Sequence, residues 1–271
     1  MGRQYTREEF AAKLGVAERG DSKLNAAADF AARLLSSPVG DSVARIVLFG
    51  SVARGEARPG SDVDVMVFGA APRQRLMEEA AQAAWDATVE WGEQVAQLTY
   101  SLDDLFQPRS YVVYSTLKRG REIYAMDETD IRRREATAIY RKADRHLEQA
   151  QEAASQGHYE LAVVGAYAAA ELAAKALILL KPGVELAASH GGLIQIFSRE
   201  YVKTGQVPAL WGRMLNEKLE LRSRALYDTV IVVTQSDTQS VLDLARDILR
   251  FLSEQLKRVE TDSGNENPIR D

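Results

Sequence analysis

The first 120 residues alternate short apolar runs with longer amphipathic segments, and this alternation predicts a domain that mixes strands with helices. The segments with the character of strands are residues 46–49, 63–68 and 95–100. The segments with apolar or alanine positions at helical spacing are residues 1–40, 73–90 and 103–119. We expect Gly120 to close the last of these helices as a left-handed residue, since glycine adopts that conformation without steric cost.

The second half of the chain carries helical patterns and few strand signals. A charged segment begins just after Met126, so we place the boundary between two domains there. The predicted helices beyond it are residues 130–156, 159–181, 208–227 and 238–259. The Ala- and Leu-rich segment 159–181 is apolar on almost every face, which is typical of the buried member of a helical bundle.

This organisation predicts an α+β domain, with a small mixed sheet and flanking helices, followed by an all-α bundle and a polar tail. Their expected bounds are residues 1–128, 129–259 and 260–271.

Candidate chemistry lies between the first two predicted strands. Gly50 allows a tight turn as the chain leaves a strand, and Ser51 then stands at a helix N-terminus, where free N–H groups favour an anion. Asp62 and Asp64 are two positions apart on a predicted strand, so both carboxylates project from one face. Two carboxylates this close repel each other unless they share a cation, and Mg²⁺ prefers oxygen ligands. Arg54 adds positive charge beside any bound phosphates.

These residues form the pattern GSxARGxARxxSDxD over residues 50–64, in which Asp62 lies twelve positions after Gly50. The pattern resembles the minimal nucleotidyltransferase domain of the DNA polymerase β superfamily, in which Gly-Ser follows one strand and Asp-x-Asp lies on the next. The resemblance implies that Asp62 and Asp64 hold two Mg²⁺ ions and carry catalysis, and that Gly50, Ser51 and Arg54 bind a nucleoside triphosphate, with ATP expected. Taken singly, Gly-Ser and Asp-x-Asp are both common structural features.

The family's usual third carboxylate, on the following strand, is missing from this sequence. Residues 95–100 contain no Asp or Glu. Gln97 is expected to face the site but cannot accept a proton, and Glu93 and Asp103 flank the strand as possible substitutes. Three outcomes are therefore left open for the site. It turns over slowly, it uses a base supplied by the substrate or a partner, or it binds a nucleotide without catalysis.

Residues from about 131 to 257 resemble a HEPN domain, an all-helical family common in prokaryotic defence and stress proteins. The resemblance rests on the segments 158–159, 166–177, 189–197 and 222–228. Many HEPN domains are ribonucleases that use an Arg followed, after four to six residues, by a His. Here Arg222 is followed at that spacing by Tyr227, and a formal match at Arg141 and His146 falls on the first helix of the domain, the wrong place.

In related toxin–antitoxin pairs a nucleotidyltransferase adenylylates a Tyr near this motif. Tyr227 is therefore either such an acceptor or a tyrosine packed in the bundle with its hydroxyl at the rim. The resemblance also implies a homodimer formed through the HEPN domain.

Composition removes several other classes of protein. The chain has 271 residues, of which 46% are hydrophobic, enough for two cores. The absence of Cys excludes disulfides, thiolate nucleophiles and cysteine-ligated metals, and three His argue against a His-rich metal site. A net charge of −5 does not indicate a nucleic-acid partner. We find no signal peptide and no stretch that approaches 18 uncharged apolar residues, so a cytoplasmic protein without membrane contact is expected.

The sequence therefore predicts a fused nucleotidyltransferase–HEPN enzyme that moves a nucleoside monophosphate, AMP from Mg·ATP, to a hydroxyl on a protein and releases pyrophosphate. Two alternatives stay open. One is an antibiotic nucleotidyltransferase of the aminoglycoside type, which uses a small-molecule acceptor. The other is a catalytically weak module that binds a nucleotide or RNA.

Overall fold

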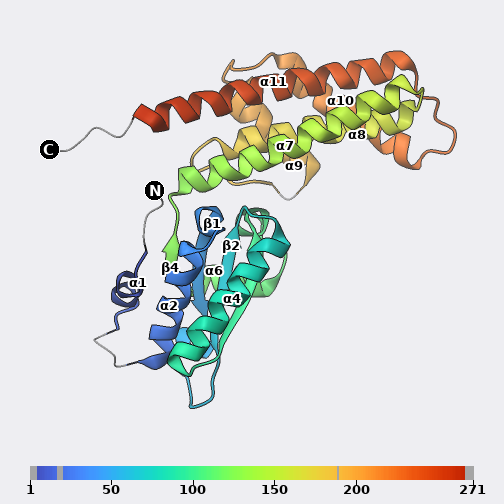
Figure 1. Cartoon of the computed structure of the whole chain (residues 1–271). Helices are drawn as coiled ribbons and strands as arrows, with labels where there is room; N and C mark the ends of the chain where they lie inside the picture. The colour runs from blue at the N-terminus through green and yellow to red at the C-terminus, as the bar shows by residue number, and fades with distance from the viewer. Residues whose placement is uncertain (1–4, 17–20, 188, 266–271) are drawn as a thin grey trace. The chain divides into compact units, whose positions relative to one another are not determined.

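The computed structural model describes residues 5–16, 21–187 and 189–265. The chain divides into two compact units, Met1–Ile131 and Arg132–Asp271. The first unit is a sheet with helices on both faces, and the second consists of helices (Figure 1).

Among the described residues of the first unit, four strands form one mixed sheet: β1 (Val43–Phe49), β2 (Val63–Gly69), β3 (Val95–Ser101) and β4 (Arg121–Ala125). Their order is β3-β2-β1-β4. β1 is antiparallel to both β2 and β4, whereas β2 and β3 are parallel. The sequence patterns do not predict β4, because only Ile123 of this edge strand is buried and no apolar run marks it.

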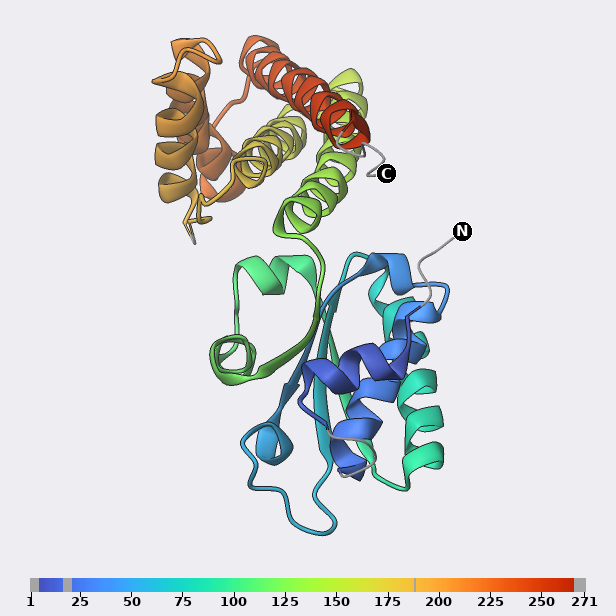
Figure 2. The same cartoon turned by 90° about the vertical axis from the view of Figure 1, so that its left-hand side faces the viewer.

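Apolar residues on β2 alternate between two cores, one on each face of the sheet. Val63, Val65 and Val67 pack with residues of α1 (Arg7–Lys13), α2 (Ser22–Ser36) and α4 (Arg73–Trp91). Met66 and Phe68 pack instead with Val113. Val113 lies on α6 (Tyr111–Arg119), which follows the short helix α5 (Leu102–Phe106). Figure 2 shows these two sets of helices on opposite faces of the sheet. The period of two along β2 therefore decides which side chains face α6.

The segment expected to be one helix over 103–119 is two helices, α5 and α6, with Pro108 between them. Proline lacks an N–H and disfavours helix in the residue before it, and Ser101 and Ser110 each cap one of the two new N-termini.

Gly120 is needed for a reason other than the expected left-handed cap. Its backbone is extended, with φ −69° and ψ 162°. A Cβ there would overlap Val47 Cγ1 and stand 2.6 Å from the Thr116 carbonyl oxygen, so the glycine permits close approach to β1. A left-handed cap is seen instead at Gly92, with φ 66°, at the end of α4.

In the second unit, α8 (Tyr159–Leu179) is the central helix, as its apolar pattern predicts. The other elements are α7 (Glu128–Ser155), which begins in the first unit, α9 (His190–Phe197), a π-helical segment (Ser198–Val202), α10 (Ala209–Tyr227) and α11 (Gln235–Asn265). Tyr167 and Tyr201 are buried, and their hydroxyls donate to the carbonyls of Leu215 and Leu177, at 3.1 and 2.6 Å. These bonds connect α8 to α10 and to the π-helical segment.

One expectation about the second unit needs correction. α11 continues through Asn265, so the first part of the expected tail is helical; residues 266–271 lie outside the described part of the chain. Among the described residues, one helix, α8, is also long and apolar enough by length and composition to cross a membrane. Since 61% of its most apolar window is buried within the structure, α8 fits the core helix of a bundle.

Candidate active site

The site begins where β1 ends and a short helix, α3 (Gly50–Ala53), starts. Gly50 has φ +72°, a left-handed conformation that an L side chain rarely adopts. A Cβ at Gly50 would overlap Asp64 Oδ2 and stand 3.0 Å from Asp64 Cγ. Glycine is therefore required here twice, by the backbone angle and by the carboxylate against it. Ser51 is the next residue of the turn, in the first turn of α3.

Asp64 reaches Gly50 because β1 and β2 are paired. Phe49 is the cross-strand partner of Asp64, and both lie on the face that carries Met66 and Phe68, towards α6. Asp64 is half-buried, whereas Asp62, just before the strand begins, is exposed. The sheet thus places one carboxylate against the turn at Gly50 and Ser51 and leaves the other exposed just before the strand.

The two carboxylates affect each other electrostatically. Burial raises the pKa of Asp64, and the negative charge of Asp62 raises it further, while the Arg54 guanidinium acts in the opposite direction. Asp62 and Asp64 are therefore close enough to repel, as their spacing predicts. A bound cation would relieve that repulsion.

The two aspartates fit a divalent metal that the substrate helps to bind. Within residues 5–16, 21–187 and 189–265, no group of three or more His, Cys, Asp or Glu side chains could enclose an ion. Mg²⁺, however, is commonly bound by one or two carboxylates together with substrate phosphates and water, rather than by a cage of protein ligands. The pair Asp62 and Asp64 matches that donor set.

The position that would complete the site is occupied by a methyl group. β3 runs parallel to β2, and its residue in register with Asp64 is Ala96. Gln97 is in register with Val65, whose side chain belongs to the core beneath α2 and α4. Gln97 therefore lies on the face opposite to Asp64, and the expectation that it faces the site is wrong. The predicted alternation of side chains along β3 is correct. Which face each side chain takes, however, depends on the pairing of β3 with β2, and the sequence pattern does not contain that pairing.

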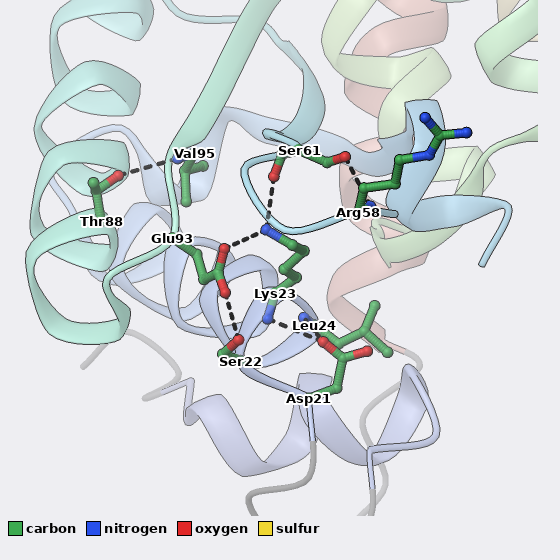
Figure 3. A network of polar contacts seen from close by, with 9 residues as sticks. All are labelled: Asp21, Ser22, Lys23, Leu24, Arg58, Ser61, Thr88, Glu93 and Val95. Carbon is green, nitrogen blue, oxygen red and sulfur yellow. Dashed lines mark hydrogen bonds and ion pairs between the residues drawn. The ribbon is translucent and has the colours of Figure 1, made fainter. Parts of the chain in front are cut away.

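The two possible substitutes are both held by basic residues. Glu93 pairs with Lys23 and accepts a hydrogen bond from Ser22 at 2.6 Å (Figure 3). These hydrogen bonds, from Lys23 first and then Ser22, lower the pKa of Glu93. Asp103 pairs with Arg109 at 2.5 Å. Since a carboxylate stabilised in its charged form is a weak proton acceptor, Glu93 is a poor replacement for the missing base.

A cavity of about 250 Å³ adjoins the turn at Gly50. Gly50 and Arg54 line it from one side, and Tyr111 and Arg119 of α6 line it from the other. Asp62 and Asp64 are not part of its wall, but Gly50, which contacts Asp64, is. Arg54 also pairs with Glu56 at 2.7 Å, in a solvent-exposed position. Two arginines and an aromatic ring around one hollow suit an anionic, aromatic ligand such as a nucleotide.

In the second unit, the structure does not bring Arg222 and Tyr227 together. Both lie on α10, five positions apart, so they point about 140° away from each other around the helix. Arg222 is half-buried, and its charge acts on the hydroxyl of buried Tyr167. Tyr227 is 79% exposed, so the expectation of a packed tyrosine is wrong. Its hydroxyl is open to a reacting partner.

Comparison with known proteins agrees with this division. Residues 31–130 match the family model of the nucleotidyltransferase domain, and residues 136–256 match that of the HEPN domain. The chain is therefore a nucleotidyltransferase domain followed by a HEPN domain. A protein of Methanocaldococcus jannaschii named "Putative toxin MJ0142" is 27% identical over 111 residues, which make up 41% of this chain and 74% of that protein.

Sequence reasoning missed two contributors to the surroundings of the site. Lys23 lies about 40 positions before the aspartates. It is on a helix whose sequence pattern indicates an amphipathic helix but no functional residue. Arg119 lies at the end of a helix predicted only as a structural element. In both cases the relevant contact depends on tertiary packing, and neither residue belongs to the GSxARG or SDxD pattern.

Proposed function

We propose that this protein is a divalent-metal-dependent nucleotidyltransferase that moves AMP from Mg·ATP to a hydroxyl on a protein and releases pyrophosphate. The observation that carries the proposal is the contact of Gly50 with Asp64, because it joins a phosphate turn to a metal-binding carboxylate. The match of residues 31–130 to the nucleotidyltransferase domain family also supports nucleotidyl transfer as the class of reaction.

Each residue has a definite role in this proposal. Asp62 and Asp64 would hold the metal ions, and the turn at Gly50 and Ser51 would bind the triphosphate through backbone N–H groups. Arg54 would neutralise phosphate charge. Bound Mg²⁺ would supply Lewis-acid stabilisation of the charge that develops on the phosphates.

The reaction is a displacement at the α-phosphorus. The acceptor oxygen forms a bond to this phosphorus, the bond from it to the β-phosphate bridging oxygen breaks, and pyrophosphate leaves. The hydroxyl proton passes to water or to a group on the acceptor, because the in-register position on β3 is Ala96. This arrangement favours an acceptor that contributes its own base. The same observation favours, as a second candidate, a module that binds nucleotide with little turnover.

The protein acceptor is inferred from the second unit and from a relative named as a toxin. Tyr227 is the candidate, since it is 79% exposed at the end of α10. Val230 and Val232, both 82% exposed, follow it closely in the chain. Exposed apolar side chains of this kind are typical of association surfaces, and they support the proposed homodimer through the HEPN domain.

Label transfer from ATP carrying ³²P at the α-phosphate tests the acceptor. Label on the protein that disappears in Tyr227→Phe, but persists in the control Tyr114→Phe, would identify Tyr227 as the acceptor. Tyr114 is a suitable control because it is also exposed, at 51%, and lies on α6. Label that moves only to an added aminoglycoside would replace the protein acceptor with a small molecule. Nucleotide binding without transfer to any acceptor would favour the binding module.

A further inference from the structure

Lys23 makes a set of contacts that the nucleotidyl-transfer reaction does not by itself explain (Figure 3). Its ammonium group donates to the Ser61 carbonyl oxygen at 2.7 Å and pairs with the Glu93 carboxylate. The side chains of Lys23 and Glu93 are only 12% and 21% exposed. Ser22, its neighbour on α2, donates a second hydrogen bond to Glu93. Because this ion pair is sheltered from solvent, its attraction is screened less than that of the exposed ion pairs elsewhere on the surface.

These contacts join three chain segments at the end of the sheet where β2 and β3 begin. Lys23 lies in the first turn of α2, Ser61 precedes β2, and Glu93 precedes β3. Two further hydrogen bonds continue the connection. The Val63 N–H donates to the Gln94 carbonyl at 2.8 Å, and the Val95 N–H donates to the side-chain hydroxyl of Thr88 at 3.1 Å. The starts of β2 and β3 are thereby held in the register that sets Ala96 beside Asp64.

The Ser61 carbonyl belongs to the peptide group that leads directly into Asp62. Fixing that carbonyl fixes the plane of the peptide, and with it the direction in which the Asp62 backbone enters the site. The preceding loop needs such support, because every residue from 54 to 60 is exposed. Within the loop, the Arg58 N–H donates to Ser61 Oγ at 2.9 Å, and the Ser61 N–H donates to the Arg58 carbonyl at the same distance. The ammonium of Lys23 anchors this turn to the body of the domain.

We propose that Lys23 is a positioning residue that, together with Glu93, holds the Ser61 carbonyl so that Asp62 stands beside Asp64 in the geometry needed to bind a divalent cation. The inference rests on the proposed function. Mg²⁺ demands near-ideal octahedral coordination, so a small displacement of one carboxylate weakens binding. Asp62 is exposed and precedes the strand, so the β-ladder alone does not hold it.

Binding of Mn²⁺ tests this proposal without relying on turnover. Mn²⁺ is titrated into the full-length protein with α,β-methylene-ATP present, and free Mn²⁺ is followed by electron paramagnetic resonance. We expect Lys23→Met to weaken Mn²⁺ binding by about tenfold, since residues that orient metal ligands typically contribute 10- to 100-fold in affinity. Lys23→Arg retains a cationic donor and is expected to recover part of the loss.

The matched control is Lys13→Met. Lys13 also forms an ion pair in the first unit, with Glu122 at 3.3 Å, but this pair joins α1 to β4 and not to the loop before Asp62. It should leave Mn²⁺ affinity unchanged. If Lys23 had a purely structural role, Lys23→Met would unfold at a lower temperature than the wild type, but the folded variant would bind Mn²⁺ with wild-type affinity. This result would overturn the proposal.

Glu93→Gln keeps the proposal testable if Lys23→Met does not fold. It removes the charge that orients the ammonium but leaves Lys23 and Ser61 in place, so it should weaken Mn²⁺ binding severalfold; unchanged binding would count against the proposal. If the wild-type protein binds no Mn²⁺ with the nucleotide, the proposed function itself fails. If the wild type binds Mn²⁺ and both Lys23→Met and Glu93→Gln bind it equally well, only the role of Lys23 fails.

Discussion

Gly50 lies directly against the carboxylate of Asp64, so that a single methyl group at Gly50 would overlap Asp64 Oδ2. The contact exists because Phe49 and Asp64 are cross-strand partners, and the chain turns sharply just after Phe49. The turn at Gly50 and the Asp64 carboxylate are therefore one structural unit. A change in either is expected to disturb the other.

Gly50→Ala should lower both stability and nucleotide binding. The left-handed backbone costs about 1–2 kcal/mol with an L side chain, and the overlap with Asp64 adds to that cost. Gly55→Ala is the matched control, because Gly55 has nearly the same angle, φ +71°, but open space around its Cβ position. Urea unfolding should show a loss for both variants and a larger one for Gly50→Ala. Equal losses, with nucleotide affinity unchanged in both, would show that the contact with Asp64 is unimportant.

The raised pKa of Asp64 predicts a dependence of stability on pH. Because the folded-state pKa lies above the unfolded value of about 3.9, ionisation of Asp64 opposes folding. The favourable contribution of the protonated form is complete below the unfolded pKa and is lost as the pH rises through the folded pKa. Asp64→Asn should therefore stabilise the metal-free protein at neutral pH, and the gain should shrink as the pH falls towards 4.

Thermal unfolding of the wild type and Asp64→Asn across that pH range measures this effect. Mg²⁺ with a nucleotide should stabilise the wild type but not the variant, since a ligand stabilises the state that binds it. A variant that is less stable than the wild type at every pH would contradict the assigned repulsion.

Ala96→Asp should supply the missing third carboxylate. The new side chain would stand in register with Asp64 and on the same face. Without metal it should destabilise the protein by like-charge repulsion. With Mg²⁺ and an acceptor it should raise the rate of pyrophosphate release by up to about 100-fold, the lower end of what a positioned general base contributes.

Gln97→Asp is the control for this experiment, because it introduces the same charge one position along, on the opposite face. Pyrophosphate release should not increase in Gln97→Asp. A similar rate gain in both variants, or none in Ala96→Asp despite tighter metal binding, would mean that the base at this site comes from elsewhere.

Much of the first unit could be predicted from local pattern. β1, β2 and α4 follow from apolar runs and periodicity, and the spacing between Gly50 and Asp62 located the turn and the carboxylate pair. Features that depend on pairing between distant segments could not be predicted. The face of Gln97 required the β2–β3 register, and the need for glycine at position 120 required the approach of β1.

In the second unit, the helices could be predicted but the surroundings of individual side chains could not. The apolar surface of α8 indicates a central helix. His190 of α9 lies against the Glu171 carboxylate on α8, a contact between two helices that the local pattern of either helix does not predict. The exposure of Tyr227 likewise depends on where α10 ends relative to its neighbours, which no local pattern encodes.

Asp62 and Asp64 are proposed to support nucleotidyl transfer, and the most direct test of that role is pyrophosphate formation from ATP and Mg²⁺ in the presence of an extract that supplies acceptors. We predict that the wild type and the control Asp86→Asn, on α4 at the other face of the sheet, release pyrophosphate. The double variant Asp62→Asn/Asp64→Asn should release none above background. Equal release by the double variant and the wild type would contradict the claim.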